Sequence, residues 1–367
     1  MRTHRSTLMK KSSLALAVGL ALCSLSAQAA TDSLRAVVTE TLDSNPEISA
    51  TLQAYYASQH EVREAYGGYL PSIDVDASVG QGNRQYDNRS DYSRNYAEIS
   101  LTQMLFDGFR VRSNLAHAEH SSRSLYYEAL GEAETKALES SEAYLDVLRY
   151  RDLVGLAQQN LSPHLRVQQQ VQERADSGVG NSADLRQIEG RVSLARSNLM
   201  TEVANLQTVT ARFQRLVGRA PGDDMEPVSL SEGAVPDSLE TVLNTGYANN
   251  PGLYAAFENI RSAEASLDTA KSNRYPTLEL GLSQGIYKNN NSFDNRTDPD
   301  SYGSENIIEL RMRYNLFNGG SDRAAERAAY SRINQAQSLR DKACVDLRHS
   351  HYRITQGLAG GAPRCLS

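Results

Sequence analysis

The chain has 367 residues, of which 22% are charged and 40% hydrophobic, and its formal net charge is −6. A net negative charge argues against nucleic-acid binding as the main role. After residue 29 no stretch approaches the about 18 consecutive apolar residues of a membrane-spanning helix, so the sequence predicts no such helix there.

Residues 1–29 have the features of an export signal. A mostly apolar run separates a basic start from the small-residue cleavage pattern Ala27-Gln28-Ala29. The run is short for a membrane anchor, so we expect cleavage, a mature chain that starts at Ala30, and an exported protein. Removing the segment takes away four positive charges and no negative ones, which moves the formal charge from −6 to −10. The four are Arg2, Arg5, Lys10 and Lys11.

The mature sequence contains one pattern twice. At an offset of 205 residues, Ser33-Leu34, Val37, Asn45-Pro46, Ala50, Ala65 and Pro71 return as Ser238-Leu239, Val242, Asn250-Pro251, Ala255, Ala270 and Pro276. At an offset of 211, Leu105-Phe106-Asp107-Gly108 returns as Leu316-Phe317-Asn318-Gly319. An internal duplication on this scale indicates two copies of one structural unit. We predict a signal over 1–29, a first repeat over 30–217, a linker over 218–236, a second repeat over 237–355 and an atypical tail over 356–367.

Each repeat opens with helical sequence that is interrupted by an Asn-Pro pair. Residues 47–66 and 252–272 almost entirely lack Gly and Pro, so each predicts a helix of about 30 Å. Proline is tolerated at the first turn of such a helix because its missing N–H has no partner there. Pro71 and Pro276 are expected to end the two helices.

After these prolines the apolar period changes from 3.6 to 2, as in Ile73, Val75, Ala77 and Val79. The pattern predicts β-hairpins over 71–106 and 276–317, with strands of roughly ten residues and long loops over 80–95 and 285–304. The charged residues of the polar face should face a barrel lumen if the apolar alternates face lipid. A solvated face of a soluble sheet is the alternative. These residues are Asp74, Asp76, Glu98, Glu279, Glu309, Arg311 and Arg313.

Aromatic residues gather near the ends of the predicted strands. Among them are Tyr69, Phe106, Phe109, Tyr275 and Tyr314. Aromatic side chains in such positions suit a membrane–water boundary, although ordinary hairpin packing in a soluble protein would also use them.

A long helical hairpin follows the first pair of strands. The segment from Phe109 to Asp176 contains one proline, Pro163, and would span about 100 Å as a helix. A second helix follows Ser182, with apolar residues spaced by threes and fours that predict a seam for packing against other helices. The turn between them is a candidate partner-docking tip, against the alternative of a plain αα-turn. The tip comprises Gly178, Val179, Gly180, Asn181, Ser182, Ala183 and Asp184.

The predicted strands and helices require other copies of the chain. A sheet that spans a membrane must close, because an open edge in lipid leaves backbone groups unpaired. Four strands cannot close, since about eight is the practical minimum, whereas three copies would supply twelve.

The export signal, the duplicated helix–hairpin–helix unit, the Asn-Pro pairs and the Leu-Phe-Asp/Asn-Gly turns together resemble the TolC family of outer-membrane channel proteins. The segment from Arg174 to Leu185 is similar to the periplasmic tip of that family, and Leu216-Val217-Gly218 followed by Ala220-Pro221-Gly222 resembles its exit from the first repeat. The resemblance implies a mainly α protein with membrane β-structure, a homotrimer with a 12-stranded outer-membrane β-barrel and a trimeric periplasmic α-barrel. It also implies a periplasmic adaptor (membrane fusion) protein and an inner-membrane transporter of ABC type as partners, together with outer-membrane lipid.

Residues that could carry chemistry are sparse. His117 and His120 lie three apart on a predicted helix, but no third ligand has suitable spacing, so we expect no metal site and no cofactor. Phosphate-loop, nucleophile-elbow and zinc-protease motifs are missing, so we expect no enzyme activity. After cleavage two cysteines remain, Cys344 and Cys365, and their pairing cannot be read from the sequence.

The sequence therefore predicts a passive outer-membrane duct in a tripartite export system, with type I protein secretion preferred over efflux of drugs or other small molecules. A trimeric coiled-coil surface protein or adhesin is the alternative of another class. It would place one run of strands at the C-terminus, whereas here a hairpin lies inside each repeat.

The second repeat is shorter than the first. After its hairpin turn the first repeat continues for 110 residues, Gly108 to Val217, and the second for 49, Gly319 to Ser367. We expect a frameshift or premature stop, because the returning helix and its tip have no counterpart and residues from about Ser350 look unlike those before them. We also expect an unpaired helix around Ala325 to Leu347 and impaired trimer assembly, which a stable trimer of normal tunnel length in detergent would refute.

Overall fold

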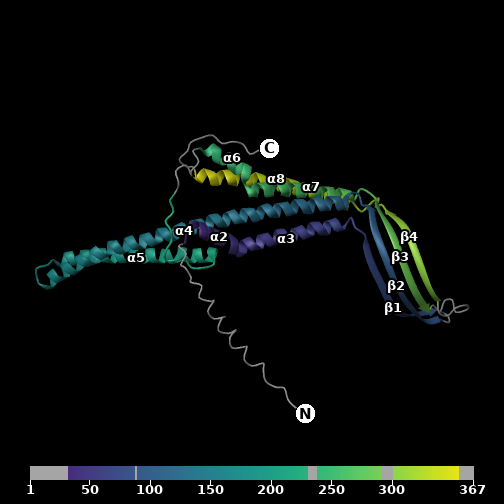
Figure 1. Cartoon of the computed structure of the whole chain (residues 1–367), viewed down its shortest axis with the longest axis horizontal. Coiled ribbons are helices and arrows are strands. Elements are labelled where there is room, and N and C mark those ends of the chain that lie inside the picture. Colours follow the sequence, from purple (N-terminus) through teal and green to yellow (C-terminus); the bar gives the residue numbers. More distant parts are fainter. Residues whose placement is uncertain (1–31, 87–88, 230–237, 291–300, 355–367) are drawn as a thin grey trace, which may run out of the picture. The chain divides into compact units, whose positions relative to one another are not determined.

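The structure, a computed structural model, describes residues 32–86, 89–229, 238–290 and 301–354. The predicted export signal and the predicted tail lie outside these ranges. The described chain is mainly helical with one antiparallel four-stranded sheet, which confirms the predicted mix of elements (Figure 1). Its described residues divide into two compact units, one made of those within 1–45 and 136–230 and the other of those within 46–135 and 231–367. The repeat boundaries remain a prediction.

The first unit is a helical hairpin of two long helices, against which a short helix packs. It contains α2 (Leu34–Ser44), the part of α4 (Arg110–Asp176) that follows residue 135, and α5 (Ser182–Val217). The α2 helix begins where the Ser33 hydroxyl accepts a hydrogen bond from the Ala36 N–H at 3.2 Å. The α5 helix ends at Gly218, whose φ of 89° lies in the left-handed region that favours glycine.

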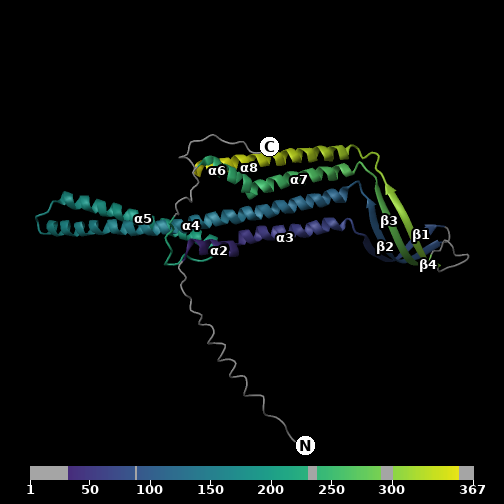
Figure 2. The same cartoon turned by 45° about the horizontal axis from the view of Figure 1, so that its top comes forward.

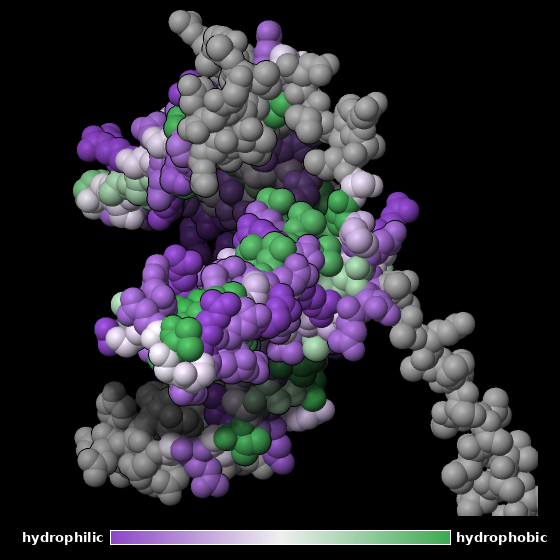
Figure 3. Space-filling view, turned by 90° about the vertical axis from the view of Figure 1, so that its left-hand side faces the viewer, coloured by the Kyte–Doolittle hydropathy of each residue, from purple (hydrophilic) through white to green (hydrophobic). Residues whose placement is uncertain are grey.

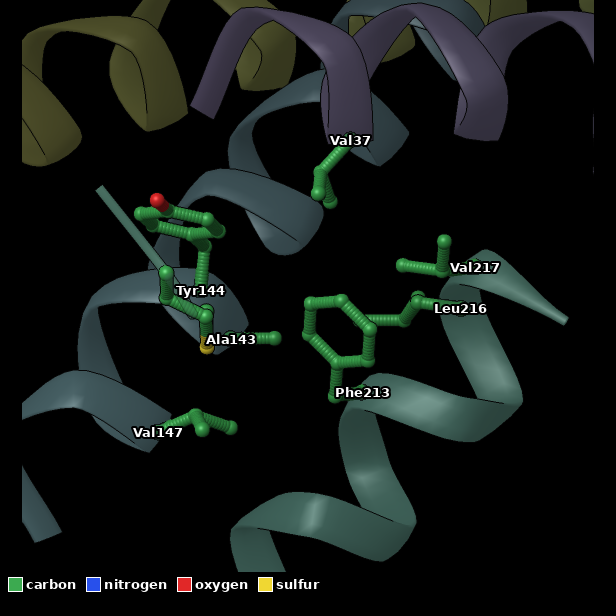
Figure 4. Packing of buried hydrophobic residues seen from close by; sticks show 8 residues of the cluster. Val37, Ala143, Tyr144, Val147, Phe213, Leu216 and Val217 are labelled. Carbon is green, nitrogen blue, oxygen red and sulfur yellow. The ribbon is translucent and has the colours of Figure 1, made fainter. Parts of the chain in front are cut away.

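The core of this unit lies where the three helices meet. In Figure 4 the ring of Phe213 from α5 points toward Val37 of α2 and toward α4. The cluster is completely or almost completely buried, so it stabilises the unit without help from another molecule. Its members are Val37, Ala143, Tyr144, Val147, Phe213, Leu216, Val217 and Met225.

The second unit joins a sheet to a group of helices. It contains α3 (Pro46–Gly67), α4 up to residue 135, α6 (Leu239–Asn249), α7 (Pro251–Ser272) and α8 (Ser321–Ile354). The bounds of α3 and α7 confirm the predicted helices. The side chain of Asn250 caps α7 by accepting a hydrogen bond from the Leu253 N–H at 3.0 Å, with Pro251 in the first turn. None of the helices in the described ranges is both long and apolar enough to cross a membrane.

The sheet has the order β1 (Ser72–Tyr86), β2 (Arg89–Phe106), β3 (Thr277–Asn290) and β4 (Ser301–Arg313), with antiparallel neighbours. Figures 1 and 2 both show the helices of this unit leading to the same end of the sheet. The two halves of the duplicated pattern thus pair through β2 and β3.

The strands are longer than the roughly ten residues predicted, and the predicted extent of the loops was wrong. Strand structure continues to Tyr86 and resumes at Arg89, and it continues to Asn290 and resumes at Ser301. Polar residues such as Asn95 and Lys288 face each other across β2 and β3. Backbone pairing extends the ladder without apolar side chains, because each strand satisfies the peptide groups of its neighbour.

The expectation of an unpaired helix around residues 325–347 was also wrong. The α8 helix packs along α7, with Ala329 buried and Leu347 in a small cluster with Leu253. Arg274 at the end of α7 forms a bidentate ion pair with Glu326, and Asn273 donates a hydrogen bond to Asp322 at 2.9 Å. The partner of α8 is therefore the preceding helix of its own repeat, so an unpaired helix no longer argues for impaired trimer assembly.

Candidate functional site

The strand register gathers all seven predicted lumen residues on one face of the sheet. Directly paired residues of antiparallel strands project to the same face, so Asp76 lies with Glu98, and Glu279 lies with Arg311. The β2–β3 register places the even-numbered residues of β2 up to Met104 with the odd-numbered residues of β3. One charged face therefore runs across all four strands.

This charged face is hollowed. A cavity of about 350 Å³ is lined by acidic side chains and Arg311, together with small residues and the apolar residues Leu101, Leu282 and Ile307. Arg311 forms an ion pair with Glu309 of its own strand. The register adds a charged residue that the sequence analysis missed, Glu305, which pairs with Gly285 in line with Glu98. The polar–apolar alternation of β4 did not reveal Glu305, because this residue follows a predicted loop and the apolar Ile307 lies on the polar face next to it.

The opposite face of the sheet is apolar and exposed. Ile308 is 80% exposed and Val75 is 72% exposed. Among the described strands, β1 pairs only with β2 and β4 pairs only with β3, so the outer side of each carries unpaired backbone groups. The sheet has one apolar face, one charged face and two open edges.

The Leu-Phe-Asp-Gly turn fixes the junction between the sheet and the helices. Asp107 accepts a hydrogen bond from the Val111 N–H at 2.7 Å, which starts α4. Gly108 has a φ of 70°, and a Cβ atom there would lie 2.6 Å from the Ser272 carbonyl oxygen. Arg110 then donates a hydrogen bond to Asn273 at 2.5 Å. Glycine is required because α4 starts against the end of α7.

The predicted tip, residues 178–184, lies at the turn between α4 and α5 in the first unit. The N–H groups of Val179 and Gly180 both donate to the carbonyl oxygen of Arg174, at 3.1 and 2.9 Å. A Cβ atom on Gly180 would lie 2.6 Å from the Ala175 backbone nitrogen, so the turn admits no side chain there. The Asn181 side chain caps α5 by accepting from the Ala183 N–H at 2.9 Å. Val179 is 85% exposed.

The surface on the side of the α4–α5 turn is mixed in character. Figure 3 views the molecule from the side on which the α4–α5 turn lies in Figure 1, and hydrophilic and hydrophobic residues are interspersed there. At the turn itself the exposed apolar Val179 lies close in sequence to the exposed polar residues Asn181 and Asp184.

The two histidines contact α7 in the second unit. His117 lies 3.0 Å from the Ser262 carbonyl oxygen, and His120 lies 2.7 Å from the Glu258 carboxylate. Glu258 is buried and also accepts a hydrogen bond from Arg261 at 2.8 Å. In the part of the chain that the structure describes, no group of three His, Cys, Asp or Glu side chains is arranged to hold a metal ion. The His120–Glu258 pair joins residues 138 positions apart, which no local pattern could predict.

A polar clamp, also missed by the sequence analysis, ties residue 32 to the linker in the first unit. Arg219 donates to both carboxylate oxygens of Asp32, at 2.8 and 3.0 Å, and to Glu40 at 3.0 Å. The Tyr144 hydroxyl contacts the Asp32 and Glu226 carbonyl oxygens at 2.5 and 2.7 Å. The hydrogen bonds from Arg219 hold the pKa of the Asp32 carboxyl below its ordinary value, and those to Asp32 and Glu40 raise the pKa of Arg219.

Comparison with known proteins identifies what these surfaces belong to. Residues 37–219 and 242–350 match the outer membrane efflux protein family. The chain belongs to that family. The match spans both repeats and confirms the resemblance to TolC-type channels and the predicted location in the bacterial outer membrane, with helices that extend into the periplasm. The coarse prediction of a passive export duct is confirmed with it.

Curated relatives extend over most of the chain. The outer membrane efflux protein BepC of Brucella suis is 25% identical over 331 residues, which cover 89% of this chain and 70% of BepC. The outer membrane protein TolC of Escherichia coli is 22% identical, covering 94% of this chain and 70% of TolC. The alkaline protease secretion protein AprF of Pseudomonas aeruginosa is 24% identical, covering 88% of this chain and 69% of AprF.

Solved structures share the fold. The CmeC outer membrane channel of Campylobacter jejuni superposes with a TM-score of 0.74 at 12% sequence identity, covering 88% of this chain and 70% of CmeC. At that identity the likeness concerns the fold alone. It extends over the helices and the sheet together, as the family assignment requires.

Proposed function

We propose that this chain is one protomer of a homotrimeric outer-membrane duct for type I protein secretion. The observation that carries the proposal is the sheet with its exposed apolar face, its charged face and its two open edges. Each open edge in lipid leaves backbone groups unpaired at several kcal/mol each, so the edge strands β1 and β4 need partners. Three copies would supply twelve strands and close them into a barrel.

In this arrangement the apolar face contacts lipid and the charged face lines the lumen. Both signs of charge occur there, with Asp76 and Glu98 on one hairpin and Arg311 and Arg313 on the other. A mixed, hydrated lining favours a wide passage of low selectivity over an ion filter. The duct itself would do no chemistry and would depend on partners for energy.

The proposed partners are a periplasmic adaptor and an inner-membrane transporter of ABC type. The tip supports adaptor docking because its turn carries little side-chain bulk and presents Val179 to solvent. A helical hairpin of the adaptor could therefore approach the two helix ends closely. Docking at residues 178–184 is part of this proposal.

Type I secretion is preferred for the cargo because of the resemblance noted for the tip, Arg174 to Leu185, and for the start of the linker, and because AprF is a protease secretion protein. Efflux of small molecules is the second candidate, since BepC is an efflux protein of comparable identity. In cells that lack their own duct, the chain should restore export of a protein carrying a type I signal. Restored drug resistance without protein export would favour the second candidate.

The proposed closure of the barrel, in which β1 of one copy of the chain pairs with β4 of the next, can be tested by cross-linking these edge strands. Val75 of β1 and Leu310 of β4 are replaced together by cysteine in the full chain, and detergent extracts are oxidised. We expect covalent dimers and trimers on a denaturing gel, whereas Val75→Cys and Leu310→Cys alone should give none above the wild-type background. A product confined to monomers would contradict closure through β1 and β4.

Docking at the tip is tested by Val179→Asp. Leu194→Asp on α5 is the matched control, since Leu194 is also highly exposed (64%) and lies on the same helical hairpin. We expect Val179→Asp to abolish export and adaptor cross-linking while the extracted protein keeps its helical circular dichroism. Equal export by the two variants would remove residues 178–184 as the docking site.

A further inference from the structure

A pocket of about 410 Å³ lies in the second unit, where α4 starts and α7 ends. Aromatic and cationic side chains line it together. They are Phe109, Arg112, Lys271 and Tyr275, and Ala116 of α4 and Asp268 of α7 also line the pocket. All of these residues lie outside the strands and outside the predicted tip.

The pocket continues the apolar face of the sheet. Phe106 pairs with Leu278 across β2 and β3, which places its ring on the apolar face. The rings of Phe109 and Tyr275 pack edge-on against Phe106, with centroids 5.5 and 6.5 Å away. A molecule whose apolar part lies on the sheet would therefore have its polar end at this pocket.

The charges in the pocket favour an anion at that polar end. Arg112 is exposed, and the structure records no hydrogen bond or ion pair for it within the described ranges. Lys271 pairs with Asp268 at 2.9 Å, and both side chains remain solvent-accessible. Two cations against one carboxylate leave a net positive charge, and Arg112 has its whole guanidinium fork available.

We propose that this pocket binds the phosphate of a phospholipid headgroup in the periplasmic leaflet of the outer membrane. The acyl chains lie along the apolar face, the aromatic rings sit at the level of the headgroup, and Arg112 and Lys271 contact the phosphate oxygens. The inference rests on the proposed orientation of the apolar face toward lipid. It assigns the residues just below the strands to the binding of individual lipids.

Photo-cross-linking in membranes tests the site and the orientation separately. A photoreactive phenylalanine analogue replaces Phe109 in one full-length variant and Ile308, in the middle of the apolar face, in another. We expect both to acquire the mass of a phospholipid after irradiation. Lipid at position 308 with protein at position 109 would overturn the lipid site and leave the proposed function intact. Absence of lipid at both positions would overturn the proposed orientation as well.

A titration tests the two cations. Full-length protein in detergent is titrated with phosphatidylglycerol and followed by native mass spectrometry. The double variant Arg112→Gln/Lys271→Gln should bind at least about tenfold more weakly, because two charge-assisted contacts are lost. Arg166→Gln/Arg191→Gln removes two exposed cations of the other unit and should bind as wild type. Equal binding by the two double variants would overturn the assignment.

Inorganic phosphate supplies the last arm of this experiment. It carries the same charged group without acyl chains, so an excess of it should leave the bound phosphatidylglycerol in place. Displacement of the lipid by inorganic phosphate would overturn the lipid site and identify a site for free phosphate.

Discussion

The sheet of β1 to β4 and the core shared by α2, α4 and α5 differ in the exposure of their apolar side chains. The core buries Phe213 and Val37 completely, whereas the sheet leaves Ile308 80% exposed. Burial stabilises by about 25 cal/mol per Å² of apolar surface, so the core is stable by its own packing. The sheet gains no such stabilisation from its exposed apolar face alone, and in the proposed function lipid covers that face and other strands pair with its edges.

The largest expected effect is in the core, where Phe213→Ala removes a completely buried ring. The variant should lose about 3–5 kcal/mol of unfolding free energy, because the cavity cannot be refilled by lipid or by a partner. Thermal unfolding of the purified protein, followed by far-UV circular dichroism, measures the loss. A change below about 1 kcal/mol would show that the core does not depend on its own packing.

The next effect is expected on the apolar face of the sheet. Ile308→Arg should cost about 2–4 kcal/mol in the membrane-inserted state if the side chain lies near the bilayer midplane. The matched control is Ser283→Arg, on the charged face. The share of the protein in the membrane fraction and the yield of trimer should fall only for Ile308→Arg. A larger loss for Ser283→Arg would reverse the assignment of the two faces.

A smaller effect is expected at the polar clamp of the first unit. Asp32→Asn weakens the hydrogen bonds to Arg219 and should cost about 1 kcal/mol, since the partly exposed guanidinium limits the gain. The pKa of Asp32 is lower in the folded protein than in the unfolded chain. Its contribution is therefore complete above the ordinary Asp pKa of about 4 and is lost as the pH falls through the lower folded value.

Unfolding curves measured from pH 7 down to pH 2 test this linkage. The wild type should have the higher unfolding free energy at neutral pH, and this difference from Asp32→Asn should disappear within the acidic part of that range. A difference in unfolding free energy that stays constant at all pH values would contradict the titration of Asp32.

The smallest effect is expected for an exposed apolar residue of the first unit. Met200 on α5 is 73% exposed, and Met200→Gln should change the unfolding free energy by less than about 0.5 kcal/mol. Thermal unfolding in detergent and trimer yield together measure this. A marked fall in trimer yield would extend the dependence on other copies from the sheet to α5.

Much of the fold was predictable because its signals are local. Ser33 and Asn250 mark helix starts through their own side chains, and the alternation around Val75 predicts a two-faced strand. The tip was predictable because Gly178 and Gly180 serve a turn whose contacts reach only a few residues. Its role as a docking site stays a prediction.

Other features depend on residues far apart in the chain. The extension of β3 to Asn290 follows from backbone pairing with Ser93 of β2, which side-chain patterns do not report. The clamp between Asp32 and Arg219 and the contact of His120 with Glu258 join segments that no spacing relates. The packing of α8 on α7 was missed because a stripe on a helix does not identify its partner.

Local signals in the sequence were enough to predict the helices α3 and α7 and the two-faced character of the strands around Val75 and Leu280, because caps, prolines and side-chain periodicity act over a few residues. That the polar residues of all four strands share one face could be learned from the folded chain alone, because it depends on the register between β2 and β3, which are far apart in the sequence. A shift of that register by one residue would bring the charged residues of one hairpin onto the apolar face of the other.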